Sequence, residues 1–196
     1  MKSNNVWMKF LMVALVFALF IANIPMKNVS AVEKKLSEKE AVAIMEAVSR
    51  SSVTNEDGTV FVNEEQLKKE LKGNRKYTEI KKELKELGLL TNDPIEEKVS
   101  SNSSKASMMA AASSSQINPK WKAVRDACAK KYIQNKYGLT GVAAIVAALL
   151  EGDFKKGLRL LLTKGASLTL AGLLTTYGHM NYKCIKLANS KHRVYK

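Results

Sequence analysis

The chain has 196 residues, which is enough for one domain or two small ones, and its 46% hydrophobic and 26% charged residues exclude a wholly disordered protein. Its formal net charge of +14 is unevenly placed, because residues 1–31 carry +3, residues 32–116 carry −1 and residues 117–196 carry +12. A strongly basic C-terminal region favours a polyanionic partner such as a membrane, a cell wall or a nucleic acid.

The first 31 residues have the layout of a secretory signal peptide. Lys2 and Lys9 provide the positive start, and residues 10–22 form an uncharged run of 13 residues. This run is short for a membrane-spanning helix, which needs about 20 residues. We expect cleavage between Ala31 and Val32 and secretion of the mature chain, with an uncleaved N-terminal anchor as the alternative.

Residues 32–97 are nearly neutral and predict a small helical segment. Ser37 and Glu40 form a capping box, which predicts a helix beginning there. Residues 59–62 predict a short strand or an extended run, residues 63–72 a second helix capped by Asn63, and residues 77–87 a third helix. A charged, helical segment of this size is typical of a pro-region that inhibits or chaperones the part that follows.

Residues 98–116 are rich in Ser and Ala and predict a flexible linker. Exposed linkers of this kind are where proteases cut. The linker is therefore either a processing site that releases residues from about Ser113 onward or a spacer between two parts that remain joined.

Residues 117–196 begin with a predicted basic amphipathic helix, capped by Asn118 and followed by a proline at its first position. Such helices lie at anionic membrane surfaces, although the same pattern also occurs in helices that pack on a core. The side chains that we expect to anchor this region at a membrane surface are Trp121, Lys130, Lys131, Lys155, Lys156, Lys183 and Lys186.

Three apolar stretches follow, at residues 137–150, 158–163 and 165–182. Their small residues, among them Gly138 and Gly165, are typical of helices that approach one another closely in lipid. We expect either a helical hairpin that inserts into a membrane or a compact helical bundle, and the two states can interconvert. The predicted membrane-inserting residues are Leu149, Leu150, Leu158, Leu160, Leu161, Leu162, Leu168, Leu170, Leu173 and Leu174.

The two cysteines, Cys128 and Cys184, enclose this apolar region. In an exported chain an even pair usually forms a disulfide. Closing a loop of this length would stabilise the fold by roughly 4 kcal/mol in the chain-entropy model.

No catalytic or metal-binding motif is present in the sequence. His179 and His192 are 13 residues apart, and no Cys/His group has the spacing of a zinc site. We therefore expect neither an enzyme nor a cofactor. The aromatic residues are too few and too scattered for a nucleic-acid stacking platform, so we expect no nucleic-acid partner.

In layout, the chain resembles secreted bacteriocin precursors of Gram-positive bacteria, particularly the sporulation-delaying toxin type. The shared features are a signal peptide, a charged pro-region and an apolar C-terminal peptide with a disulfide. The resemblance implies a toxin that collapses the membrane potential of competing cells. The chain departs from that type in the wide separation of Cys128 and Cys184.

The sequence therefore predicts a mainly α-helical secreted precursor of a membrane-active antibacterial peptide. Its target would be an anionic bacterial membrane or cell envelope, with a cognate immunity protein as a further partner. The alternative is a non-lytic secreted envelope-binding or immunity protein that acts as an intact chain.

Overall fold

The computed structural model describes residues 35–92 and 117–195. The predicted signal peptide with its cleavage site at Ala31 and Val32, and the linker at residues 98–116, lie outside the described residues. The described residues 35–92 and 117–195 belong to one compact unit. The change in composition between the two halves is therefore not a boundary between two separately folded bodies.

The first described range combines helices with a small sheet. Its elements are α2 (Glu38–Arg50), β1 (Ser52–Thr54), β2 (Val60–Asn63), α3 (Glu64–Glu70), α4 (Tyr77–Glu86) and β3 (Leu90–Thr91). The strand order is β1-β2-β3. β1 pairs with β2 antiparallel across the turn, whereas β3 pairs with β2 parallel. The parallel pairing requires a crossover connection, which α3 and α4 provide.

Local signals in the sequence correctly predicted the helices of this range. The Ser37 hydroxyl accepts a hydrogen bond from the Glu40 backbone N–H at 3.3 Å, and the Glu40 carboxylate accepts one from the Ser37 N–H at 3.1 Å. The Asn63 side chain caps α3 by accepting from the Gln66 N–H at 2.9 Å. The predicted strand at residues 59–62 corresponds to β2, whereas β1 and β3 were not predicted from the sequence.

The second described range is helical apart from an isolated bridge between Ile117 and Tyr195. The predicted cap at Asn118 is confirmed, because its side chain accepts from the Lys120 N–H at 3.0 Å. The elements are α5 (Pro119–Tyr137), α6 (Ala143–Leu150), α7 (Phe154–Thr163), α8 (Leu170–Gly178), the π-helix η1 (His179–Lys183) and α9 (Cys184–Asn189).

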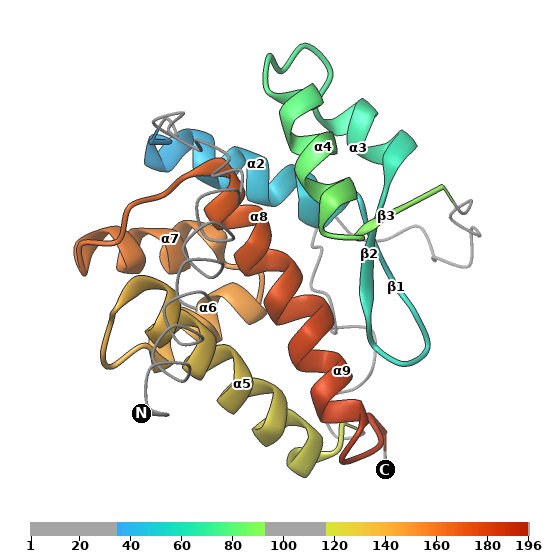
Figure 1. Cartoon of the computed structure of the whole chain (residues 1–196), viewed down its shortest axis with the longest axis vertical. Coiled ribbons are helices and arrows are strands. Elements are labelled where there is room, and N and C mark those ends of the chain that lie inside the picture. The colour runs from blue at the N-terminus through green and yellow to red at the C-terminus, as the bar shows by residue number, and fades with distance from the viewer. Residues whose placement is uncertain (1–34, 93–116, 196) are drawn as a thin grey trace, which may run out of the picture. The chain divides into compact units, whose positions relative to one another are not determined.

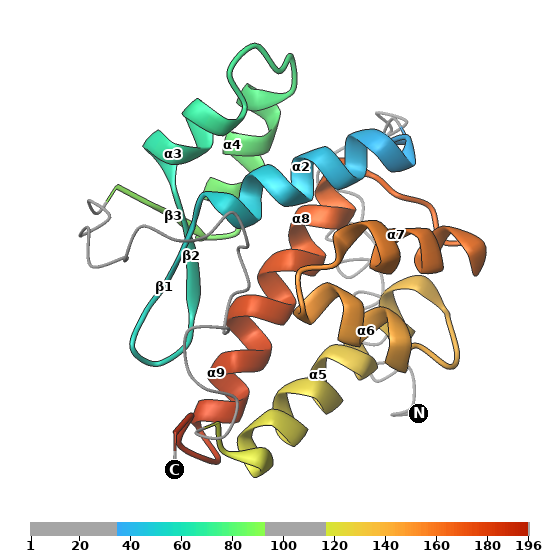
Figure 2. The same cartoon turned by 180° about the vertical axis from the view of Figure 1, so that it is seen from behind.

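The helices α8, η1 and α9 follow one another without a break and run between the two groups of elements (Figures 1 and 2). On one side, α5 packs along η1 and α9, and α6 pairs with α7. On the other side, α4 contacts α8 and β2 contacts η1. Helix α2 packs on both α7 and α8, so elements from the first range contact much of the second.

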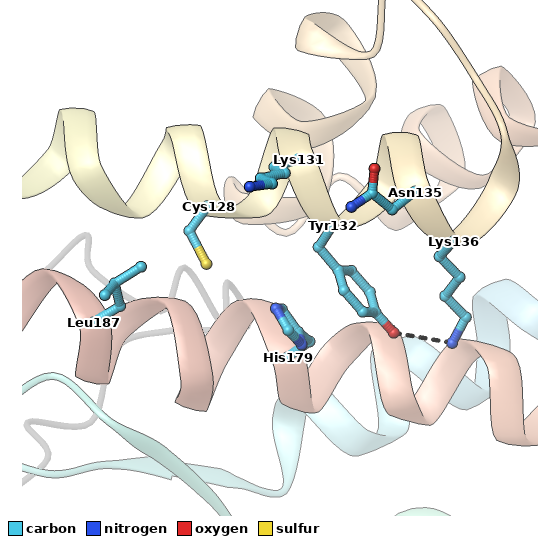
Figure 3. A pocket seen from close by; sticks show the side chains of 7 residues that line it. All are labelled: Cys128, Lys131, Tyr132, Asn135, Lys136, His179 and Leu187. Atoms are coloured by element: carbon cyan, nitrogen blue, oxygen red, sulfur yellow. Dashed lines mark hydrogen bonds between the residues drawn. The ribbon is translucent and has the colours of Figure 1, made fainter.

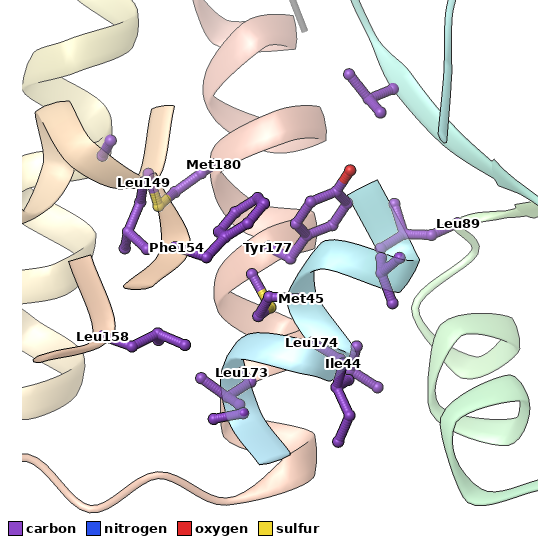
Figure 4. Packing of buried hydrophobic residues seen from close by; sticks show 14 of the residues in the cluster. Ile44, Met45, Leu89, Leu149, Phe154, Leu158, Leu173, Leu174, Tyr177 and Met180 are labelled. Carbon is purple, nitrogen blue, oxygen red and sulfur yellow. The ribbon is translucent and has the colours of Figure 1, made fainter. Parts of the chain in front are cut away.

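One hydrophobic core is built from both described ranges (Figure 4). Ile44 and Met45 of α2 lie in it beside Leu173 and Tyr177 of α8 and Phe154 of α7. Tyr177 is only 1% exposed. The mainly helical fold class is confirmed, and the core joins the predicted pro-region to the predicted C-terminal bundle.

Gly138 and Gly165 do not mediate the predicted close pairing of helices. Gly138 and Gly165 adopt the left-handed region, with φ of 64° and 85°, at turns that end α5 and α7. Close approach occurs instead at Gly157 and Gly178. A Cβ atom on either would lie 2.6 Å from a methyl carbon, of Leu149 and of Leu89 respectively.

Candidate membrane-binding region and disulfide cluster

The leucines predicted to insert into a membrane lie in or against the core. Seven of them are buried: Leu149, Leu158, Leu161, Leu168, Leu170, Leu173 and Leu174. The remaining three are partly buried and pack against the core: Leu150, Leu160 and Leu162. In this fold the side chains therefore contribute to stability, and a membrane would reach them only after the helices separate from their neighbours.

Polar contacts between the two ranges reinforce this packing. The Leu36 N–H donates to the Leu168 carbonyl oxygen at 2.8 Å, which joins the start of the first range to the segment before α8. Arg159 of α7 lies 3.6 Å from the Glu38 carboxylate. The Asn189 side-chain amide donates to the backbone carbonyl of Asp57 at 2.7 Å. Residues 35–92 therefore make direct polar contacts with α7, with α9 and with the segment before α8.

The lysines predicted to anchor the chain at a membrane are on the surface. All six lysines are exposed, and they come from four elements: Lys130 and Lys131 of α5, Lys155 and Lys156 of α7, Lys183 of η1 and Lys186 of α9. None of the six forms an ion pair with a carboxylate of the described residues. The first range differs, because several of its cations pair locally, for example Arg50 with Glu70 and Lys81 with Glu64.

The prediction that Trp121 lies at the surface is wrong. It is 0% exposed, and its indole N–H donates to the Asn189 side-chain oxygen at 2.6 Å. The Arg125 guanidinium stacks over the indole at 5.2 Å from the ring centroid. The amphipathic face of α5 thus packs on the core, which was the alternative interpretation of that pattern.

The predicted disulfide between Cys128 and Cys184 is confirmed. The two Cα atoms lie 5.5 Å apart, and 56 positions of sequence separate them. The bond joins the middle of α5 to the first residue of α9. It therefore closes a loop that contains α6, α7, α8 and η1.

His179 lies close to both cysteines of this disulfide. Figure 3 shows it beside Cys128 and Tyr132. The imidazole stacks on the Tyr132 ring, with centroids 3.8 Å apart and an interplanar angle of 12°. Burial lowers the pKa of His179, and the positive charges of Lys183 and Lys136 lower it further. The ring is therefore held in its neutral form at neutral pH.

Lys136 ties α5 to α8 from the same side of the molecule. Its ammonium donates to the Tyr132 hydroxyl at 3.0 Å and to the Gly172 carbonyl oxygen at 2.8 Å. It also lies 5.5 Å and 5.9 Å from the ring centroids of Tyr132 and Tyr137. An open cavity between α5 and the C-terminal helices is lined by Cys128, Lys131, Tyr132, Asn135, Lys136, His179 and Leu187 (Figure 3).

The cluster of Cys128, His179 and Cys184 was not predicted from the sequence. Its one local signal is the spacing of five residues between His179 and Cys184, which an α-helix would place about 140° apart around its axis. The π-helical turn has one more residue per turn and brings them closer. Nothing in the sequence marks that turn.

Among the described residues, no helix has the length and apolar character needed to cross a membrane. No family model, no curated protein sequence and no solved structure matches this chain.

Proposed function

We propose that this chain is a secreted precursor of a membrane-active antibacterial peptide, in which residues 35–92 hold the apolar helices of residues 117–195 in a folded, masked state. Release of the C-terminal region would then expose the leucine-rich helices to a target membrane. The chain would act without a catalytic residue.

The burial of the apolar helices against the first range is the observation that carries this proposal. Leu173 and Leu174 of α8 and Leu158 of α7 share a core with Ile44 and Met45 of α2. Removing residues 35–92 would expose this apolar surface to water, at a cost of roughly 25 cal/mol for each Å². A bilayer offers an alternative place to bury it, which supplies a driving force for insertion.

The exposed lysines support the first step of the proposed mechanism. A Lys side chain near an anionic membrane surface contributes about 1 kcal/mol to binding. Six such side chains without described carboxylate partners, in a region of net charge +12, favour accumulation at anionic lipid headgroups. Binding through these lysines does not require the core to open, so adsorption would precede insertion.

A second candidate is a secreted envelope-binding or immunity protein that acts as an intact chain. The shared core favours it, because each described range buries apolar residues against the other. In this case the lysines would bind an anionic envelope polymer, and the leucines would have no role beyond stabilising the fold.

Intact-mass spectrometry of the protein secreted by a producing bacterium distinguishes the two candidates. The precursor hypothesis predicts a fragment that begins within residues 98–116 and ends at Lys196, two mass units lighter before reduction than after it. A single species that begins at Val32 and kills no sensitive bacteria would contradict that hypothesis and support the intact binding protein.

A further inference from the structure

The disulfide and its neighbouring histidine place three metal-ligating side chains together. The Sγ atoms of Cys128 and Cys184 and a ring nitrogen of His179 all lie within 4.8 Å of one another. It is the one such group of three His, Cys, Asp or Glu side chains in the described ranges 35–92 and 117–195. The ligands come from three elements, since Cys128 lies in α5, His179 begins η1 and Cys184 begins α9.

The π-helical turn is what aligns two of these ligands. The Cys184 backbone N–H donates to the His179 carbonyl oxygen, five residues before it. Single π-helical turns inside longer helices occur frequently at functional sites. Figure 3 shows His179 facing Cys128 of α5. The Sγ atom of Cys184 lies within 4.8 Å of the ligand atoms of both residues.

We infer that the reduced form of the protein binds one zinc-like divalent cation through Cys128, Cys184 and His179. Two thiolates and an imidazole are ligands that Zn²⁺ prefers, and three protein ligands leave a fourth position for water. That position would face the open cavity lined by Tyr132 and Asn135. This site is independent of the proposed membrane activity, because it uses none of the buried leucines.

The electron and proton balance of this step is simple. A phosphine reductant breaks the S–S bond and leaves as its oxide, taking the oxygen from water, and two thiols are formed. Metal binding then releases the two thiol protons. Two thiolates and a dication together carry no net charge. The nearby Lys131 and Lys136 therefore do not repel the occupied site as they would repel a bare cation.

The backbone need not move far to accept the ion. Zn–S bonds of about 2.3 Å in tetrahedral geometry place two sulfurs roughly 3.8 Å apart. The Cα atoms of the two cysteines are already 5.5 Å apart, so rotation about the side-chain bonds is enough to separate the sulfurs. His179 is held in place by its stacking on Tyr132.

Cobalt titration of the reduced full-length mature chain tests this inference. We expect one Co²⁺ per chain, with a sulfur-to-cobalt charge-transfer band and the strong visible bands of tetrahedral cobalt, both removed by an equivalent of Zn²⁺. The oxidised protein should show neither band. His179→Ala should weaken binding at least tenfold, whereas the matched variant His192→Ala should bind as tightly as the unmodified chain.

Circular dichroism spectra recorded during the same titration keep the test decisive if reduction unfolds the chain. Zn²⁺ should then restore the helical signal of the reduced protein, because a metal that binds only the folded state stabilises it. The inference is overturned if the reduced, folded protein shows no cobalt bands, if Zn²⁺ fails to restore a lost helical signal, or if His179→Ala binds as tightly as His192→Ala.

Discussion

The hydroxyl oxygens of Ser52 and Tyr177 lie 2.6 Å apart and join residues that are 125 positions apart in the sequence. The Ser52 hydroxyl also lies 2.7 Å from the Val48 carbonyl oxygen, which can only accept. Ser52 therefore donates its one proton to Val48, and Tyr177 donates to Ser52. The buried ring of Tyr177 thus fills the core while its hydroxyl reaches β1 in the other range.

Tyr177→Phe removes this hydrogen bond and leaves the ring in place. We expect the free energy of unfolding to fall by about 1 kcal/mol, the usual net contribution of such a bond. Tyr182→Phe is the matched control, since the Tyr182 hydroxyl accepts a longer bond of 3.3 Å from the exposed Lys186. Chemical denaturation measures both variants, and equal losses would contradict a specific role for the Ser52–Tyr177 contact.

Alkaline pH should weaken the fold through the same residue. Burial raises the pKa of Tyr177 far above its ordinary value of 10.0. Above about pH 10 the unfolded chain releases the phenol proton while the folded chain still holds it, so stability is lost as the pH rises, by up to about 1.4 kcal/mol for each pH unit.

The free energy of unfolding of the unmodified protein should therefore fall towards that of Tyr177→Phe as the pH rises above about 10. Chemical denaturation of both proteins at a series of pH values measures the difference between their free energies of unfolding. The titration of the lysines and of the other tyrosines affects both proteins equally, so it cancels in this difference. Parallel stability curves across this range would show that Tyr177 does not stay protonated in the fold.

Gly178 is a position where the two described ranges approach closely, because a Cβ atom there would lie 2.6 Å from Cδ1 of Leu89. Gly178→Ala should destabilise the protein by about 1–3 kcal/mol through overpacking. Leu89→Ala should cost about 2–5 kcal/mol through a cavity.

The double variant is the matched test of that contact. Because Leu89→Ala makes room for the added methyl group, the two changes together should cost at least 0.5 kcal/mol less than the sum of their separate costs. Denaturation of all four proteins gives the coupling energy. Additive costs would mean that Gly178 does not contact Leu89.

The lysines of the second range should control binding to anionic membranes. We expect replacement of Lys130, Lys131, Lys155 and Lys156 by Gln to weaken binding to phosphatidylglycerol vesicles by at least tenfold, up to about 4 kcal/mol if each lysine contributes about 1 kcal/mol. A sedimentation assay measures the bound fraction.

Four exposed lysines of the first range provide a control with the same change in net charge: Lys68, Lys69, Lys72 and Lys85. Their replacement by Gln should alter vesicle binding much less. If both sets of substitutions weaken binding equally, the attraction depends on total charge alone and the second range contains no specific binding surface.

Those parts of the fold that depend on local signals could be predicted from the sequence. The capping box at Ser37 and the caps at Asn63 and Asn118 define helix starts within three residues, and each occurs as predicted. The disulfide was predicted because the predicted export would provide an oxidising context for the two cysteines. These inferences require no knowledge of how distant segments pack.

Features that depend on distant contacts could not be predicted in this way. Strands β1 and β3 are only three and two residues long and pair with β2 only in the folded chain. The burial of Trp121 and the contact between Ser52 and Tyr177 depend on which face of each helix meets the other range. A periodic apolar pattern identifies a face but not its partner. For the same reason, the meeting of Cys128, His179 and Cys184 was not predicted.

Dye release from phosphatidylglycerol vesicles tests the masking of the apolar helices most directly. A site for a specific protease, inserted within residues 98–116 of a chain that starts at Val32, allows the same preparation to be compared before and after cleavage. We predict that the uncleaved chain binds the vesicles and releases little dye. The cleaved chain should release dye at the same protein concentration at which the isolated peptide of residues 117–196 does. Equal release before and after cleavage, or no release by the isolated peptide, would contradict the account.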